Sequence, residues 1–454
     1  NALTAFDQQL SLPLEIPENE QRIGKPMEVI SNQPSLLMQR ILDRNNLYRA
    51  LKQVTRNQGA PGVDGMSVNQ LPDYLKRHWN GIRQRLLNGT YRPQPVKRVE
   101  IPKPDGRKRK LGIPTVLDRF IQQAIAQVLS PIWENQFHPN SYGFRPNRSA
   151  HHAVYQLQRY VREGYGITVD IDLKSFFDEV NHDRLMVKLK KRHGDKTLLT
   201  LINAYLKAPI TLADGRQKSV KGVPQGGPLS PLLSNIVLNE FDWELHRRRL
   251  RFVRYADDCQ ILVGSRRAGE RIMASLSHYL NKSLKLKVNH EKSAVDNVWR
   301  RAYLGFALSK RDWRLKVSSK AVQVLKRKVR AICRRTRGHS LKQIVEELRK
   351  SLLGWKAYFD ISEVLSPLKD LDKWIRRKLR CYLWKQWGRS GYRRLRQLGV
   401  ERILAWNTAK SAHGPWRLSR SPALYKALPN RYFRHLGLPE LAARKEDYLN
   451  RLGT

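Results

Sequence analysis

The sequence predicts an α+β fold over about the first 300 of its 454 residues, followed by a basic helical domain. Two observations support this division. In the first part, β-branched runs such as 166–173 (GITVDIDL) and 251–263 (RFVRYADDCQILV) are interspersed with helical patterns. From Lys310 to Arg396, by contrast, the chain has 27 Lys or Arg and 7 Asp or Glu, and its apolar residues recur at helical spacing.

The N-terminal part begins with a segment that has little periodic structure. Residues 1–35 contain four prolines and few regularly spaced apolar residues, which predicts an N-terminal extension. A helical pattern then begins near Ser35, and the turn formers of 57–65 (NQGAPGVDG) end it. A second helix is expected over about 70–88.

A basic β-hairpin follows these helices. Residues 96–101 alternate apolar and basic side chains, and Lys-Pro-Asp-Gly at 103–106 predicts a tight turn that leads into a returning basic strand up to Ile113. Helical patterns occupy 116–130 and 148–162.

The C-terminal part has the pattern of amphipathic helices with basic outer faces. Leu325, Val329 and Ile332 fall at i, i+4 and i+7, and Ile375, Leu379 and Tyr382 repeat this spacing. The local net charge from Lys310 to Arg396 is +20, from 27 − 7. Four tryptophans are interleaved with these charges: Trp355, Trp374, Trp384 and Trp387. Basic and aromatic residues in one domain indicate contact with nucleic acid.

The overall charge points to a polyanionic partner. There are 86 Lys and Arg against 39 Asp and Glu, a formal charge of +47, so nucleic acid is the leading candidate. An anionic membrane surface would require one basic amphipathic segment or a lipidation signal, whereas here the excess is spread along the chain. No run is long enough to span a membrane. Three cysteines give neither a disulfide framework nor a zinc spacing, and no secretory signal is visible, which predicts a cytoplasmic protein.

Three acids stand out as candidates for chemistry. Asp172 ends one predicted strand, and Asp257 and Asp258 lie in the turn of a predicted hairpin. A carboxylate beside β-branched residues needs a partner or a metal, and Mg²⁺ is the simplest one. Two such ions can activate a 3′-hydroxyl and stabilise a leaving pyrophosphate. Asp170 lies on the same face as Asp172, so spacing alone leaves either as the ligand.

Six motifs occur in a fixed order along the chain: 57–65, 101–103 with 112–114, 141–146 (SYGFRP), 170–178 (DIDLKSFFD), 224–231 (PQGGPLSP) and 255–258 (YADD). YADD has the form of the YxDD box of reverse transcriptases, and the whole set resembles the proteins encoded by bacterial group II introns. The resemblance implies a right-hand polymerase. Its fingers and palm, with an antiparallel palm sheet, would occupy 36–308. A helical thumb or maturase domain (domain X) that binds RNA would occupy 309–400, and a basic DNA-binding-like region 401–454.

The resemblance also implies roles for individual residues. Asp172, Asp257 and Asp258 would hold two Mg²⁺ ions, with the Leu173 carbonyl as a further ligand. Lys292 resembles the lysine that protonates the leaving pyrophosphate. Residues that would bind the deoxynucleotide or template are Lys103, Arg109, Phe177, Gln225 and Gly226, with Phe177 as the gate against a ribose 2′-hydroxyl. Residues that would contact RNA are Trp355, Arg376, Arg377 and Arg380.

The implied function is an RNA-directed DNA polymerase that extends a primer 3′-end on an RNA template, with a maturase role in splicing and mobility of a group II intron. Its partners would be the RNA template, intron RNA, primer and target DNA, and dNTPs, with no membrane, in a bacterial cytoplasmic ribonucleoprotein. No zinc-bearing nuclease motif is found, as in the class C lineage. Two alternatives remain: a non-catalytic RNA-binding splicing cofactor, and a free-standing enzyme of this type that serves DNA repair or phage defence.

Overall fold

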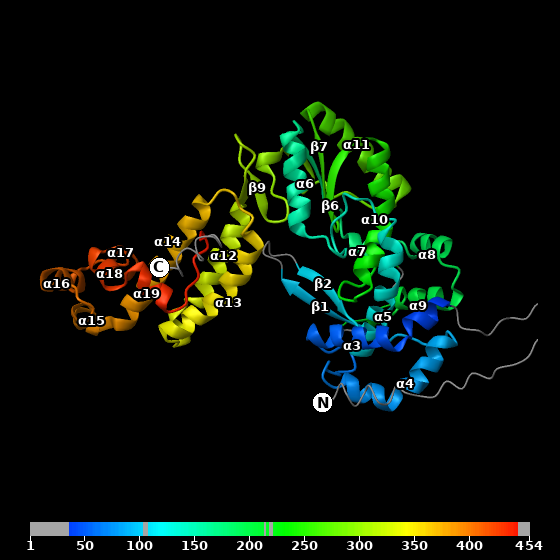
Figure 1. The fold of residues 1–454 in the computed structure, drawn as a ribbon, viewed down its shortest axis with the longest axis horizontal. Helices are drawn as coiled ribbons and strands as arrows, with labels where there is room; N and C mark the ends of the chain where they lie inside the picture. Colours follow the sequence, from blue (N-terminus) through cyan, green and yellow to red (C-terminus); the bar gives the residue numbers. More distant parts are fainter. Residues whose placement is uncertain (1–35, 103–107, 213–214, 218–220, 444–454) are drawn as a thin grey trace, which may run out of the picture. The chain divides into compact units, whose positions relative to one another are not determined.

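The chain forms two compact units, seen as ribbons in Figure 1. The computed structural model describes residues 36–102, 108–212, 215–217 and 221–443. Unit 1 comprises Asn1–Ala153 and Ile167–Val295, and unit 2 comprises Val154–Gly166 and Asp296–Thr454. The predicted N-terminal extension, residues 1–35, lies outside the described residues.

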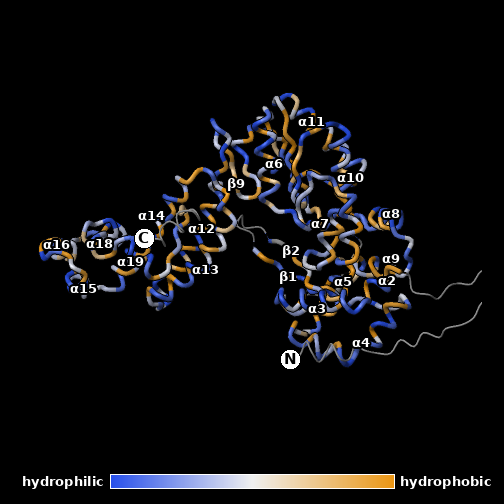
Figure 2. Tube along the Cα trace, in the orientation of Figure 1, coloured by the Kyte–Doolittle hydropathy of each residue, from blue (hydrophilic) through white to orange (hydrophobic). Residues whose placement is uncertain are grey.

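The described part of unit 1 begins with three helices, α2 (Leu36–Ile41), α3 (Arg44–Arg56) and α4 (Leu71–Leu87), and a fourth, α5 (Val116–Glu134), follows after a β-hairpin. The sequence predicts one continuous helical pattern near its start, but the structure breaks it in two. Asp43 causes the break, because its carboxylate accepts hydrogen bonds from the N–H groups of Asn45 and Asn46 at 2.9 and 3.2 Å and so starts α3. Helix α5 is buried over most of its length and packs on α3, and hydrophobic residues colour it strongly in Figure 2.

The basic hairpin forms as predicted and belongs to a four-stranded sheet. Its strands are β1 (Val96–Pro102), β2 (Lys108–Ile113), β4 (Ile210–Leu212) and β5 (Gly215–Gln217), in the order β2-β1-β4-β5. Strands β1 and β2 pair antiparallel, from Lys97 opposite Ile113 to Pro102 opposite Lys108. The turn at its tip, residues 103–107, lies outside the described residues.

A second four-stranded sheet holds the candidate acids. Its strands are β3 (Ile167–Ile171), β6 (Arg251–Tyr255), β7 (Asp258–Val263) and β8 (Ala294–Asn297), in the order β6-β7-β3-β8. Strand β7 pairs antiparallel with both β6 and β3, as the predicted palm sheet requires. Helix α11 (Arg266–Ser283) packs on β3 and β7, and α10 (Ser230–Arg247) packs on β6. Three more helices complete unit 1: α7 (Phe176–Glu179), α8 (His182–Arg192) and α9 (Lys196–Leu206).

Unit 2 is mostly helical, as its sequence pattern predicts. Its elements are most of α6 (Ala150–Arg162), η1 (Val298–Arg300), β9 (Phe306–Leu308), β10 (Leu315–Val317), α12 (Ser319–Ile332), η2 (Arg335–Arg337), α13 (Leu341–Phe359), α14 (Ser366–Trp387), η3 (Gly388–Ser390), α15 (Gly391–Gln397), α16 (Arg402–Lys410), α17 (Pro415–Leu418), α18 (Pro422–Ala427) and α19 (Asn430–His435). The apolar stripe of α14 is buried, as are Leu325 and Val329 of α12, and these two helices pack on one another and on α13.

Helix α6 is joined to the rest of unit 2 by polar contacts. The Gln158 side-chain amide donates to the Trp313 carbonyl at 2.9 Å and to a Glu363 carboxylate oxygen at 2.6 Å. The same Glu363 carboxylate accepts the Leu315 N–H at 2.6 Å. Within the described ranges, no helix has the length and apolar character needed to cross a membrane.

Candidate active site

The three candidate acids lie at one end of two neighbouring strands. Strand β3 pairs with β7 so that Ile171 lies opposite Cys259, the last pair of the ladder, and extending this register by one residue brings Asp172 toward Asp258. Residues directly opposite in an antiparallel pair have Cβ atoms about 5 Å apart. Asp257 precedes Asp258 in the loop that joins β6 to β7. Asp170 instead pairs with Gln260 inside the ladder, so Asp172 is the acid that adjoins the loop.

The loop before β8 holds Asp172 from the other side. The backbone N–H of Asn289 donates to the Asp172 carbonyl at 2.8 Å, and its side-chain amide donates to Oδ1 at 3.2 Å. The N–H of Asp172 donates to Ser293 Oγ at 3.0 Å. Lys292 Nζ lies 3.6 Å from Asp172 Oδ2. These four contacts from one short loop therefore fix the position of both the backbone and the carboxylate of Asp172.

The backbone carbonyl of Leu173 accepts no hydrogen bond within the β-bridge that Leu173 forms. Leu173 faces Val288 in an isolated antiparallel bridge, in which the hydrogen bonds come from Lys174 N–H to the Lys287 carbonyl and from Asn289 N–H to the Asp172 carbonyl. Leu173 is thus at a non-hydrogen-bonded position of this ladder.

The donor set suits a hard divalent cation. Three carboxylates and one backbone carbonyl supply only oxygen ligands, which Mg²⁺ prefers. The Asp172 side chain is 39% exposed and pairs with the Lys292 ammonium, so its carboxylate can interact with a cation. Within the described ranges, no three His, Cys, Asp or Glu side chains already converge at metal-binding distance.

The loop that carries Asp257 is a two-residue hairpin turn. Tyr255 pairs with Asp258, which leaves Ala256 and Asp257 as the loop residues. Ala256 has φ 56°, while Asp257 is not among the residues with positive φ, the combination found in a type II′ turn. Such turns favour Gly at the first loop position, so Ala256 holds a strained backbone conformation.

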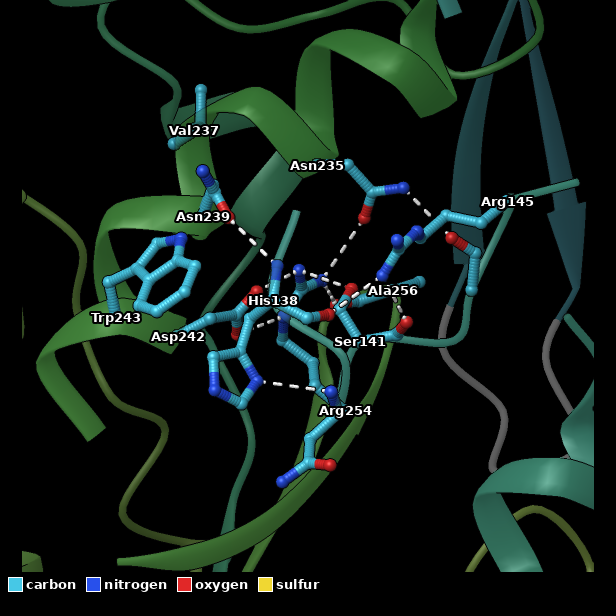
Figure 3. A network of polar contacts seen from close by, with 12 residues as sticks. His138, Ser141, Arg145, Asn235, Val237, Asn239, Asp242, Trp243, Arg254 and Ala256 are labelled. Atoms are coloured by element: carbon cyan, nitrogen blue, oxygen red, sulfur yellow. Dashed lines mark hydrogen bonds and ion pairs between the residues drawn. The ribbon is translucent and has the colours of Figure 1, made fainter. Parts of the chain in front are cut away.

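A buried arginine anchors this turn (Figure 3). Arg254 is 1% exposed and forms an ion pair with the fully buried Asp242 of α10, with Nη2 and Oδ2 2.5 Å apart. Its Nη1 donates to the Ala256 carbonyl at 2.6 Å. Two further acceptors are Ser141 Oγ at 2.7 Å and Asn235 Oδ1 at 3.2 Å. This network was not foreseen, although Arg254, which follows the apolar Phe252 and Val253 in this strand, would need a partner for its charge if it were buried.

A cavity of about 510 Å³ opens beside the turn. Phe177, Gln225, Gly226 and Asp257 contribute to its wall, so four of the predicted site residues are brought together. Phe144, which lies in the 141–146 motif but was not among the predicted site residues, also lines it, and this aromatic side chain is 56% exposed with φ 58°. A strained, exposed aromatic residue at a cavity is typical of a functional site.

A second cavity, of about 410 Å³, shares Gln225 with the first. Arg98 and Lys110 of the hairpin and Asp178 of α7 line it. The sequence did not single out either of these basic residues. The sequence instead indicated Lys103 and Arg109. Lys103 lies outside the described residues. For Arg109 only the backbone is described, and it pairs with Ile101.

The glycine of the Gln225-Gly226 pair allows the hairpin to dock. Gly112 N–H donates to the Gln225 carbonyl at 2.8 Å. Gly226 has φ 136°, and a Cβ on it would lie 2.4 Å from the Gly112 carbonyl oxygen. Any other residue at 226 would therefore displace strand β2 from the site.

Unit 2 carries a basic and aromatic surface, here the Trp374–Trp416 cluster, defined by Trp374, Trp416, Lys326, Arg330, Arg377 and Lys378. Lys326, Arg330 and Lys378 lie 5.5 to 5.9 Å from the Trp374 ring centre. Arg377 lies 3.7 Å from the Trp416 ring centre. Cations held over indole rings are one way to stack and neutralise a nucleic-acid strand.

The other residues predicted to contact RNA differ in exposure. Trp355 is partly buried and packs on Phe359, with ring centres 4.4 Å apart. Arg376 lies 3.8 Å from Glu440. Arg380 is 2% exposed, and its guanidinium donates to the Leu428 carbonyl at 3.0 Å. Burial thus keeps Arg380 from the surface, and a direct RNA contact through it does not agree with this structure.

Two family patterns match the chain. The family described as reverse transcriptase (RNA-dependent DNA polymerase) matches residues 101–308. The group II intron, maturase-specific domain matches residues 322–399.

Several curated proteins are similar in sequence. Protein YkfC of Escherichia coli K12 is 36% identical over 316 residues, which cover 58% of this chain and 81% of that protein. The group II intron-encoded protein LtrA of Lactococcus lactis is 35% identical over 236 residues, 52% of this chain and 39% of LtrA. Among solved structures, a telomerase from Candida albicans aligns with a TM-score of 0.40 at 15% identity, over 72% of this chain and 69% of that one.

Proposed function

The chain belongs to the reverse transcriptase family and carries a group II intron maturase-specific domain, and from this premise we propose that it copies RNA into DNA by extending a primer 3′-end with deoxynucleotides. One observation supports this most strongly. The register of β3 against β7 ends at Ile171 and Cys259, so Asp172 and Asp258 follow at the same end of the two strands, beside Asp257, and Asp257 borders a cavity large enough for a nucleotide.

Asp172, Asp257, Asp258 and the Leu173 carbonyl are the groups that would hold two Mg²⁺ ions. When bound, these ions supply activation of the primer 3′-hydroxyl and neutralisation of charge on the triphosphate. The acids themselves contribute by being fixed before substrate arrives. Asn289 and Ser293 orient Asp172, and the short hairpin turn orients the other two.

The cavity walls supply selection of the incoming nucleotide. Phe177 is half-buried, its ring packs edge-on against Phe176, and its side chain can exclude a ribose 2′-hydroxyl from the cavity. Gln225 and Gly226 bring backbone close to the position of the new base pair. Arg98 and Lys110 line the adjoining cavity, where their charges would favour a triphosphate.

Lys292 is suited to donate a proton to the leaving group. Its Nζ reaches Asp172, the acid whose register sets it beside the turn, so the ammonium lies within reach of a departing pyrophosphate oxygen. In this role the Lys292 ammonium donates a proton to the leaving pyrophosphate oxygen, and the resulting amine takes up a proton from solvent before the next turnover.

We further propose that unit 2 binds folded group II intron RNA and supports its splicing. The Trp374–Trp416 cluster supports this, because it joins two indole rings to several cations within the matched maturase domain and just beyond it. Residues 401–454 would contact target DNA. The assembly would act as a ribonucleoprotein in a bacterial cytoplasm.

The test is extension of a DNA primer on an RNA template with dNTPs and Mg²⁺. Wild type is compared with Asp172→Asn and with Asp257→Asn/Asp258→Asn, and RNA affinity is measured in parallel. The Asp170→Asn variant is the matched control, since Asp170 lies on the same strand but inside the ladder. Full-length cDNA from wild type and the control, with none from the two acid variants at equal RNA affinity, is expected.

Two other outcomes select the alternatives. RNA binding without synthesis by any protein would favour a non-catalytic splicing cofactor. Synthesis without preferential binding of a group II intron RNA would favour a free-standing polymerase of DNA repair or phage defence.

A further inference from the structure

The guanidinium group of Arg254 uses all of its N–H groups in hydrogen bonds within unit 1. A guanidinium has five N–H donors, and this one meets five acceptor contacts. Nε donates to Asp242 Oδ1 at 2.6 Å, and Nη2 donates to Asp242 Oδ2 at 2.5 Å and Ser141 Oγ at 2.7 Å. Nη1 donates to Asn235 Oδ1 at 3.2 Å and the Ala256 carbonyl at 2.6 Å. No N–H group of this guanidinium remains for another acceptor.

Helix α10, the 140–143 segment and the β6–β7 turn meet at this side chain (Figure 3). Asp242 and Asn235 come from helix α10, and Ser141 comes from the 140–143 segment. That segment is also tied to the Arg254 backbone, since Arg254 N–H donates to the Asn140 carbonyl at 3.0 Å and Tyr142 N–H donates to the Arg254 carbonyl at 2.8 Å. The guanidinium is therefore immobile relative to α10 and to the strand.

The bond to Ala256 reaches the turn itself. Its acceptor belongs to the peptide between Ala256 and Asp257, which is the central peptide of the two-residue loop. Rotation of that peptide interconverts turn types, because types I′ and II′ differ in its orientation. Such a rotation changes the backbone at Asp257 and so redirects its carboxylate.

The surroundings of the turn restrict the same peptide. A Cβ on Gly143 would lie 2.3 Å from the Ala256 nitrogen, so the 140–143 segment packs directly against the loop backbone. Asn235 donates to the Gly143 carbonyl at 2.8 Å while accepting from Arg254. One polar network therefore holds both sides of the turn.

We propose that Arg254 and Asp242 are a positioning pair for the active site: Arg254 locks the Ala256–Asp257 peptide in one orientation and thereby sets the direction of the Asp257 and Asp258 carboxylates. The inference rests on the proposed polymerase function. Stability alone would not require a buried Arg254–Asp242 ion pair, because replacing such a pair with hydrophobic residues of similar volume is often neutral or stabilising.

The test separates positioning from stability with two variants. Arg254→Lys keeps the charge opposite Asp242, but one ammonium cannot reproduce the planar fork that also reaches Ala256. Arg254→Met/Asp242→Leu removes both charges and avoids leaving either one buried alone. Thr168→Ala is the control, because it removes a buried hydrogen bond to Gln260 in the same sheet, away from the turn.

Each protein is assayed for thermal unfolding, primer–template affinity, kcat and KM. A second readout does not need activity: Fe²⁺ with peroxide and ascorbate cleaves backbone near a bound metal, and the Fe²⁺ concentration that gives half-maximal cleavage near residues 172 and 257 is measured. For both Arg254 variants we expect kcat to fall on the order of 10²-fold, unchanged primer–template affinity, and weaker Fe²⁺ cleavage. Thr168→Ala should lower only the unfolding temperature.

Either of two results would overturn the proposal. One is a folded double variant with wild-type kcat and wild-type Fe²⁺ cleavage. The other is loss of kcat in Arg254→Lys only in proportion to its loss of folded protein. If the double variant does not fold, Arg254→Lys and its cleavage readout decide the question. Failure of the polymerase proposal is distinguishable, because wild type would then be inactive in the same assay.

Discussion

The Lys292 ammonium lies 3.6 Å from Oδ2 of Asp172, on a loop whose other residues hold the same acid by hydrogen bonds. The hydrogen bonds between this loop and Asp172 therefore also fix the position of the Lys292 ammonium. We expect Lys292→Gln to lower kcat by about 10² and to leave primer–template affinity within about twofold. Lys287→Gln, an exposed lysine in the same segment, is the control. Equal effects of the two substitutions on kcat would contradict a specific role.

Phe177 is predicted to discriminate against ribonucleotides. Replacement by Ala opens the cavity wall next to Phe176 and leaves space for a 2′-hydroxyl. We expect the ratio of kcat/KM for dNTPs over rNTPs to fall at least about tenfold. Single-nucleotide incorporation on an RNA template measures this ratio. A ratio that stays constant while both rates decline would assign Phe177 to packing only.

The stability of unit 1 should depend on the protonation of His138. Burial lowers the pKa of His138 to about 4, with His246, Arg145 and Arg254 adding repulsion and Asp242 opposing it. The unfolded chain takes up this proton near pH 6.5, so between about pH 6.5 and 4 it binds more protons than the folded chain. Stability is therefore lost as the pH falls through this window.

For this one group the expected loss between pH 7 and pH 5 is about 2 kcal/mol. Urea unfolding of wild type and His138→Gln at both pH values measures it, and the variant should lose less stability than wild type. A variant with the same pH dependence as wild type would show that other groups dominate.

The Asp372 carboxylate is predicted to hold the last described segment of unit 2. It is buried and accepts the N–H groups of Leu441 and Ala442 at 2.9 and 3.0 Å, and burial raises the pKa of Asp372. Asp372→Ala leaves two buried donors unsatisfied and should cost about 2 to 4 kcal/mol. Limited proteolysis near residues 440–443 should accelerate. Asp372→Asn keeps an acceptor and should show a smaller change, and equal cleavage of all three proteins would refute the prediction.

RNA affinity should depend steeply on salt, and the Trp374–Trp416 cluster should contribute to that slope. Arg377→Gln removes one cation from the cluster and should reduce the slope of log K against log salt by about 1 if it contacts a phosphate. Arg266→Gln, on helix α11 of unit 1, is the control for the loss of one positive charge. Identical slopes for both variants would exclude a local contact by Arg377.

Local patterns in the sequence predicted the elements of both units well. The alternation in 96–113 indicated the hairpin, the β-branched runs indicated β3, β6 and β7, and the helical stripes indicated α12 and α14. These signals are local, because a strand or helix shows its buried face in a few residues. The break at Asp43 was missed because a capping aspartate interrupts a helical stripe without changing its apolar period.

Contacts between distant segments were not predictable from one sequence. Spacing left Asp170 and Asp172 equivalent, and only the register of β3 against β7 distinguishes them. The side chains that accept hydrogen bonds from Arg254, those of Asp242, Asn235 and Ser141, lie 12 to 113 residues away, so no local pattern could name them. Asn289 and Ser293 were missed for the same reason, since their role depends on the loop returning to the end of β3.

Residues 154–166 lie far along the chain from the rest of unit 2, which resumes at residue 296. During synthesis on the ribosome, helix α6 must therefore leave the exit tunnel well before the strand and loop to which Gln158 binds. At ordinary rates of elongation the delay is on the order of 10 s, during which the apolar side of α6 has no native partner from its own unit. A chaperone that shields this helix would act in that interval, and a gene fragment that starts at residue 296 would produce unit 2 without it.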